Sequence, residues 1–193
     1  MIDSEKIKAF INTLKADRIS DDELISKTNG FFAENCHQLD AEFVKRLLAE
    51  KAAGNKVTLP LIEEYAYLGS PAAQVVYGTM KLEGLNVSKN QQEAIFWLKR
   101  AFNGNNPNAG VLLSAIYANG IGVAVNMQKA LAYAKVPAEL GVPKAQYCYA
   151  LLLLEDASGS VDEETVISYM VAAANNGHSK AIQFLKDNNL LDG

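Results

Sequence analysis

The sequence predicts an all-α fold, a right-handed α/α superhelix (solenoid) of antiparallel helix pairs with 36-residue repeats. Two series of residues keep this interval, one of alanines and one of glycines with a single asparagine: Ala73, Ala109, Ala145, Ala181; Gly69, Asn105, Gly141, Gly177. A fixed period in this range is the signature of a repeat architecture. Alanine, leucine and tyrosine recur while β-branched alternation is scarce, which favours helices over strands.

Residues 1–36 are predicted to form an N-terminal helical cap. Apolar residues at helical spacing predict one helix over 4–16, and a capping box at Ser20-Asp21-Asp22-Glu23 begins a second one. Both helices lie outside the repeat register. Because the terminal unit of a solenoid needs a polar outer face, we expect them to cover its open end.

Residues 37–193 are predicted to form the solenoid. It has a degenerate unit over 37–72, clear units over 73–108, 109–144 and 145–180, and a C-terminal cap over 181–193. In the degenerate unit, Asp40 is expected to cap the first helix, and Pro60 suits the first turn of the second helix. Gly69 is expected to end that second helix.

Polar, glycine and small residues that recur within the units predict where each second helix begins, ends and packs. Asn90, Asn126 and Asp162 precede these helices, where a short acceptor satisfies unpaired amides. Glu93 completes a capping box with Asn90. The glycine series follows the helix, at a position that requires a left-handed backbone. Small residues allow close helix approach and aromatic residues fill the space between helices: Gly78, Ser114, Ala150; Trp97, Tyr133, Tyr169.

Pro137 stands where other units have an alanine within the second helix. Proline lacks an amide donor and clashes with the carbonyl four residues earlier, here that of Tyr133. We therefore predict a kink or an early helix end near Val136.

These positions together resemble the Sel-one-like repeat (SLR) family, which is related to the tetratricopeptide repeats but has a longer inter-helix loop. In the unit 109–144 the resemblance is carried by Ala109, Leu113-Ser114, Tyr117, Gly120-x-Gly122-Val123, Asn126, Lys129-Ala130 and Tyr133. The units 73–108 and 145–180 match at many of the same positions, with a departure in the last unit. There Asp156 replaces the loop glycine and Gly159 is displaced, so that loop is expected to be reshaped.

The resemblance implies a non-enzymatic protein–protein interaction module that binds a protein partner on the concave face, which the first helices line. In related repeats this face is formed by residues three before and one, four and five after the small anchor. Here these are Val75, Thr79, Leu82, Glu83; Val111, Ala115, Ala118, Asn119; Tyr147, Leu151, Leu154, Glu155. The degenerate unit would add Leu39, Phe43, Arg46 and Leu47.

This predicted wall is apolar with a polar edge, which is typical of partner sites. Two alternatives stay open. The N-terminal helices could fold into the groove, or the register could differ by one residue, which would make these side chains core.

Catalytic, cofactor-binding and metal-binding patterns are not found in the sequence. Cys36 and His37 are adjacent, an arrangement that rarely serves as a nucleophilic dyad, and neither histidine has a partner at metal-ligand spacing. His178 is expected to be solvated or to cap a helix. Lys99-Arg100 is interpreted as an isolated basic pair on a helix. We therefore predict no enzymatic activity, no cofactor and no metal.

Composition limits the partners. A net charge of −4 and a pI near 5.3 argue against nucleic-acid binding, which needs clustered basic residues. The N-terminus lacks the layout of a signal peptide, and the longest apolar run is too short to span a membrane. Cys36 and Cys148 are isolated, whereas periplasmic relatives of the resembled family often carry a disulfide in each unit. We expect a cytoplasmic monomer or weak homodimer.

Three hypotheses about function follow. The first is a general interaction module whose partner is a peptide, a helix or a folded domain. The second is a bacterial immunity (antitoxin) protein that binds and neutralises a cognate toxin, a role that the resembled family includes. The third is a regulatory subunit of an enzyme.

Overall fold

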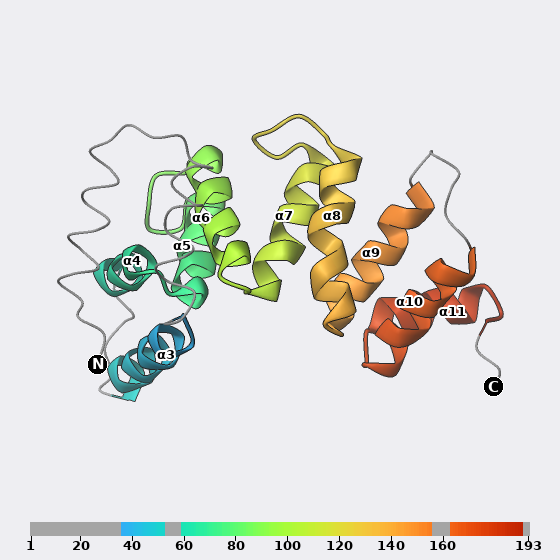
Figure 1. The fold of residues 1–193 in the computed structure, drawn as a ribbon, viewed down its shortest axis with the longest axis horizontal. Coiled ribbons are helices and arrows are strands. Elements are labelled where there is room, and N and C mark those ends of the chain that lie inside the picture. The colour runs from blue at the N-terminus through green and yellow to red at the C-terminus, as the bar shows by residue number, and fades with distance from the viewer. Residues whose placement is uncertain (1–35, 53–58, 156–162, 191–193) are drawn as a thin grey trace. The chain divides into compact units, whose positions relative to one another are not determined.

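The computed structural model describes residues 36–52, 59–155 and 163–190, and its regular elements in these ranges are α-helices (Figure 1). They are α3 (Cys36–Ala52), α4 (Leu59–Leu68), α5 (Pro71–Glu83), α6 (Gln91–Asn103), α7 (Pro107–Asn119), α8 (Met127–Glu139), α9 (Pro143–Glu155), α10 (Glu163–Asn175) and α11 (Ser179–Asp187). The predicted all-α solenoid of helix pairs is confirmed. The expected N-terminal helices, the Asp162 cap and the reshaped loop at Asp156 and Gly159 lie outside the described residues.

The helices begin at intervals of 36 residues. The first helices start at Pro71, Pro107, Pro143 and Ser179, and the second helices start at Gln91, Met127 and Glu163. Each first helix thus begins two residues before the alanine that marks its unit. Proline suits this first position because its φ angle is already helical and its missing amide would be unpaired there anyway.

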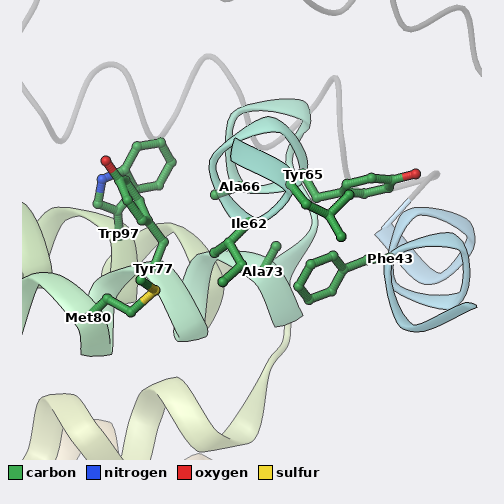
Figure 2. Packing of buried hydrophobic residues seen from close by; sticks show 9 residues of the cluster. Phe43, Ile62, Tyr65, Ala66, Ala73, Tyr77, Met80 and Trp97 are labelled. Atoms are coloured by element: carbon green, nitrogen blue, oxygen red, sulfur yellow. The ribbon is translucent and has the colours of Figure 1, made fainter. Parts of the chain in front are cut away.

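The chain divides into two compact units, residues 1–109 and 110–193. In unit 1, α5 packs against α4 and α6, and α3 contacts α4 and α5. Phe43 from α3 faces Tyr65 from α4 with ring centres 5.4 Å apart, and Tyr77 from α5 faces Trp97 from α6 at 5.3 Å (Figure 2). These buried aromatic side chains join α3, α4, α5 and α6 in one apolar core.

In unit 2, α9 packs against α8 and α10, and α11 packs against α10. Small residues stand at the close approaches: Ala145, Ala150 and Ala181 are fully buried. The same principle holds in unit 1, where a Cβ atom on Gly78 would lie 3.1 Å from Cγ of Leu98. The predicted role of the small residues as close-approach positions is confirmed.

The predicted caps of the second helices are confirmed where the structure describes them. Asn90 accepts hydrogen bonds from the amides of Gln92 and Glu93, and Asn126 accepts one from the amide of Lys129. The turns after the second helices are left-handed as predicted, with φ angles of 100°, 62°, 81° and 82° at Gly69, Asn105, Gly141 and Gly177.

The capping box at Asn90 differs from the prediction. The amide of Asn90 donates to the carbonyl of Lys81 at 2.8 Å and is therefore not available to Glu93. The Glu93 carboxylate instead accepts from the side-chain amide of Asn90 at 2.8 Å and pairs with the Lys81 ammonium at 2.7 Å. Glu93 thus joins α6 to α5.

Asp40 does not cap the helix in which it lies, because α3 already begins at Cys36. Its carboxylate accepts hydrogen bonds from the Ser70 hydroxyl and from the Ala72 amide, the latter at 3.0 Å. Ser70 in turn accepts from the amide of Ala73 at 3.1 Å. Asp40 therefore supports the start of α5. Pro60 lies in the first turn of α4, as predicted.

Of the two predicted outcomes near Val136, the early end of α8 is wrong, because the helix continues through Pro137 to Glu139, and the kink stays a prediction. Proline removes one amide donor, and here that donor is lost in the last turn. Beyond the helix, two of its last carbonyls are paired: the Leu140 amide donates to the Val136 carbonyl and the Val142 amide to the Pro137 carbonyl, both at 3.0 Å. The buried ring of Pro137 also adds apolar contact.

Candidate functional site

In unit 1, the predicted wall residues of α5 lie on the part of the helix that faces away from the core. Val75, Thr79 and Leu82 are half-buried and Glu83 is exposed, whereas Tyr77 on the opposite side is buried. The Thr79 hydroxyl donates to the Val75 carbonyl at 2.8 Å. This face is moderately apolar and ends in a carboxylate.

In unit 2, α7 offers a smaller surface than the sequence predicted. Ala115 and Asn119 are exposed and Ala118 is half-buried. Val111 is 8% exposed and packs in a core cluster with Ala138 and Ala145, so its predicted place on the wall is wrong. The face of α7 therefore has a short side chain at Ala115 and a polar one at Asn119.

The most apolar part of the predicted wall is on α9. Leu154 is 52% exposed, Glu155 beside it is exposed, and Leu151 is half-buried. Tyr147, also half-buried, stacks on the ring of His178 at 4.5 Å between centroids. Tyr147 and Leu151 thus belong partly to the packing of α9 against its neighbours, and Leu154 is the side chain most open to a partner.

The residues that the degenerate unit was expected to add do not form such a face. Leu39 and Phe43 are 3% and 2% exposed and belong to the core, because α3 turns this side toward α4 and α5. Arg46 is exposed, pairs with Glu64 at 3.7 Å and lies 5.6 Å from the Tyr65 ring centre. The side chain of Leu47 lies outside the described residues.

His178 caps α11, which is one of the two roles that the sequence predicted for it, the other being a solvated side chain. Its Nδ1 atom accepts a hydrogen bond from the Ala181 amide at 3.3 Å. The pKa of His178 is lowered, mainly because partial burial disfavours the charged ring and further because Lys180 and Lys144 lie near it. The neutral ring, which can accept this bond, is therefore favoured.

Groups with catalytic or metal-binding potential do not converge in the described residues. Burial raises the pKa of the Cys148 thiol and keeps it protonated. Burial and a hydrogen bond to Glu63 raise the pKa of the Tyr77 hydroxyl, which donates to that carboxylate at 2.8 Å. No group of three metal-ligating side chains is found in the described ranges. The side chains of Cys36 and His37 lie outside them.

One functional candidate was missed by the sequence interpretation. Arg100, treated as half of an isolated basic pair, is 6% exposed. Burial lowers its pKa to about 10, so the guanidinium is charged at neutral pH. A signal was present in the sequence, because the equivalent positions in the next two repeats are the uncharged Val136 and Ala172.

In the part of the chain that the structure describes, every helix is too short or too polar to span a lipid bilayer.

Comparisons with known proteins place these helices among repeat proteins. A family model described as Sel1 repeat matches residues 71–106, which contain α5 and α6, and residues 109–142, which contain α8 and all but the first two residues of α7. A solved Sel1 repeat protein from Oxalobacter formigenes is similar at 28% identity with a TM-score of 0.60, over 65% of this chain and 95% of that one. No curated protein sequence matches the chain.

A second solved structure shows the fold alone, because its identity is low. It is a protective antigen of uropathogenic Escherichia coli strains with an SLR fold, similar at 20% identity with a TM-score of 0.64. The match covers 90% of this chain and 37% of that one.

Proposed function

Because residues 71–106 and 109–142 match the Sel1-repeat model, we propose that the chain is a non-enzymatic module that holds a protein partner on the outward faces of its first helices. Sel1 repeats are protein-interaction modules. In solenoids of stacked helix pairs, the first helices line the concave face, and such faces serve as binding surfaces. The proposed partner is a peptide, a helix or a folded domain.

The observation that carries the proposal is the exposure of Leu154 on α9. Leu154 is 52% exposed, with the half-buried Leu151 one turn before it and the exposed Glu155 beside it. Burying an exposed leucine against a partner contributes about 25 cal/mol per Å² of apolar area. An apolar centre with a polar edge is the usual arrangement of residues at protein interfaces.

The first helices of the two units differ in a way that suits selective binding. The face of α5 combines Thr79 and Leu82 with the acidic Glu83, and the face of α7 presents Ala115 and Asn119. These side chains vary from repeat to repeat while the buried alanines do not. We propose that the variable residues select the partner and that the constant ones maintain the fold.

The proposal extends to two properties that the sequence predicted. The protein is a monomer or weak homodimer that acts without a cofactor, and it is cytoplasmic. The location is supported by the chain's two cysteines, which stand alone in the sequence instead of in pairs within each repeat.

The test compares two leucine variants in unit 2. Leu154→Asp places a charge on the first-helix face, and Leu140→Asp places the same charge just after the second helix α8, where Leu140 is 66% exposed. Tagged wild type and both variants are used to capture partners from native lysate. We expect Leu154→Asp to lose a partner that wild type and Leu140→Asp retain, with helicity unchanged in all three. Equal capture by Leu154→Asp would contradict the proposal.

The immunity role is a narrower form of the same function. It requires a captured partner that is a toxin, a one-to-one complex and loss of toxicity on binding. Several weaker partners would instead indicate a general scaffold.

A further inference from the structure

Arg100 is a buried charge held against two aromatic rings. Its guanidinium carbon lies 5.2 Å from the ring centre of Trp97 and 5.7 Å from that of Phe96. Helical side chains point back toward the N-terminus, so the Arg100 stem lies over the turn that carries both rings. Cation–π attraction holds the guanidinium there, and within the described residues none of its five N–H donors has a hydrogen-bond acceptor.

The described part of the chain offers Arg100 no anionic partner. No carboxylate there forms an ion pair with it. The two acidic side chains that act on Tyr67 have other contacts, because Glu63 accepts from the Tyr77 hydroxyl and Glu93 pairs with Lys81. A buried guanidinium without a counter-ion is costly, and an incoming anion would offset this cost.

The guanidinium donors of Arg100 can be reached from outside. Within the described residues, every fully buried side-chain nitrogen or oxygen has a hydrogen-bond partner. The Arg100 nitrogens have no such partner in the described part of the chain and are therefore not fully buried. The 6% of Arg100 that remains exposed thus includes guanidinium nitrogens.

We propose that Arg100 is a receptor for a single carboxylate, carried by an aspartate or glutamate side chain or by the C-terminus of the protein partner. The planar guanidinium donates two parallel hydrogen bonds to a carboxylate, and the two aromatic rings fix its orientation in advance. That the carboxylate belongs to a protein partner rests on the proposed protein-binding function. That Arg100 binds a carboxylate does not depend on it.

The surroundings favour a carboxylate over a phosphate. Phosphate-recognising sites combine several arginines, whereas Arg100 is the one arginine of α6. Glu63, Glu93, Lys81 and Arg100 all act electrostatically on Tyr67, so the charges around that residue are mixed and do not form a second cationic cluster.

Arg46 provides a matched control in the same unit. Like Arg100, it lies over an aromatic ring, 5.6 Å from the centre of Tyr65. Unlike Arg100, it is exposed and already has a carboxylate partner, Glu64, at 3.7 Å. A site that requires an unpaired guanidinium should therefore be present at Arg100 and absent at Arg46.

The experiment titrates N-acetylglutamate N-methylamide, a small monoanionic carboxylate, into the full chain. Trp97 is the single tryptophan of the sequence, so its fluorescence reports on the site, and the Nε–Hε NMR signals of the three arginines show which one responds. We expect a saturable change at Trp97 and Arg100 in wild type and in Arg46→Gln. In Arg100→Gln the affinity should fall at least about tenfold, because the bidentate pair is lost. Methyl phosphate should bind more weakly.

Several results would overturn the inference: no saturable change in wild type, the same affinity in Arg100→Gln, a response at Arg46 instead of Arg100, or tighter binding of methyl phosphate. If Arg100→Gln fails to fold by circular dichroism, Arg100→Lys replaces it, because lysine keeps the charge but loses the fork. The NMR titration of wild type alone also tests whether Arg100 binds the carboxylate. Because this titration contains no protein partner, a negative result would contradict the carboxylate site and leave the proposed protein-binding function to the capture experiment.

Discussion

The second helices of the two units carry different side chains at the same repeat positions. In unit 1, Trp97 is 3% exposed and has the rings of Tyr67, Tyr77 and Phe96 at 4.9, 5.3 and 5.2 Å. In unit 2, the equivalent Tyr169 is half-buried and faces Tyr149 at 5.0 Å. Three residues after each aromatic position, unit 1 has the buried Arg100, and unit 2 has Val136, which is 45% exposed, and Ala172.

This difference separates two kinds of position in the repeat. The left-handed turn residues and the small close-approach residues perform the same task in both units, since Asn105, Gly141 and Gly177 share positive φ angles. The aromatic and charged positions vary, and unit 1 concentrates them around one guanidinium. Repetition thus maintains the helix geometry, while variation within it gives each unit its own chemistry.

The largest expected effect is at the aromatic position. Trp97→Ala should lower the free energy of unfolding by about 3–5 kcal/mol, because it leaves a cavity among three rings. Tyr169→Ala, at the equivalent half-buried position, should cost about 2 kcal/mol. Urea unfolding followed by circular dichroism checks both. A larger loss for Tyr169→Ala would reverse the comparison.

The next effect has the opposite sign. Arg100→Met should raise the free energy of unfolding at pH 7 by about 1–3 kcal/mol, because replacing an uncompensated buried charge by an apolar side chain of similar length is often stabilising. Val136→Met in unit 2 should change little, since that position is exposed. A loss of more than about 1 kcal/mol in Arg100→Met would contradict the assignment of Arg100 as unpaired.

The difference in stability between wild type and Arg100→Met should depend on pH. The pKa of Arg100 is about 10 in the folded chain, below its ordinary value, because of burial. Above pH 10 the unfolded chain therefore binds more protons at this group, and the stability of wild type rises relative to Arg100→Met. The urea midpoints of wild type and Arg100→Met should thus lie closer together at pH 10.5 than at pH 8.

Substitutions at the left-handed turn residues should change the free energy of unfolding less, and by similar amounts in the two units. Gly141→Ala should cost about 1 kcal/mol, since its Cβ would meet no atom within 4 Å and the cost lies in the left-handed backbone alone. Asn105→Gly should gain a few tenths of a kcal/mol, because glycine suits that backbone better. Thermal unfolding measures both, and a gain in Gly141→Ala would contradict the assigned geometry.

The smallest effect concerns His178 in unit 2. Because burial holds its pKa below the ordinary value, the unfolded chain binds more protons there, and the contribution of this cap is lost as the pH falls below about 6.5. Amide exchange of α11 should accelerate at pH 5 relative to pH 7. His178→Asn, which caps without titrating, should remove this acceleration; an equal acceleration in that variant would exclude His178 as the cause.

The sequence predicted the elements that depend on local chemistry and missed those that depend on contacts between distant residues. Turn residues and the caps at Asn90 and Asn126 follow from backbone requirements within a few positions. Asp40 was assigned to its own helix because its partners, Ser70 and Ala72, are about thirty residues away. A helix period also fixes a face only loosely, which explains why Val111 was placed on the surface.

Arg100 shows the same limit for the candidate sites. A charged residue on an amphipathic helix is expected to be solvated, and its burial depends on Trp97 and Phe96 on its own helix and on the neighbouring Tyr67. The sequence shows that one repeat has an arginine where the next two have Val136 and Ala172. That this arginine is buried becomes clear only from the packing of the helices.

The most direct test of the central claim, that a protein partner binds the first-helix faces, is site-specific photo-crosslinking in unit 2. Benzoylphenylalanine replaces Ala115 on the first helix α7 in one protein and Ala132 on the second helix α8 in another, both being exposed alanines. The account predicts a crosslinked protein partner from Ala115 and none from Ala132. Crosslinking from Ala132 alone, or equally from both, would contradict it.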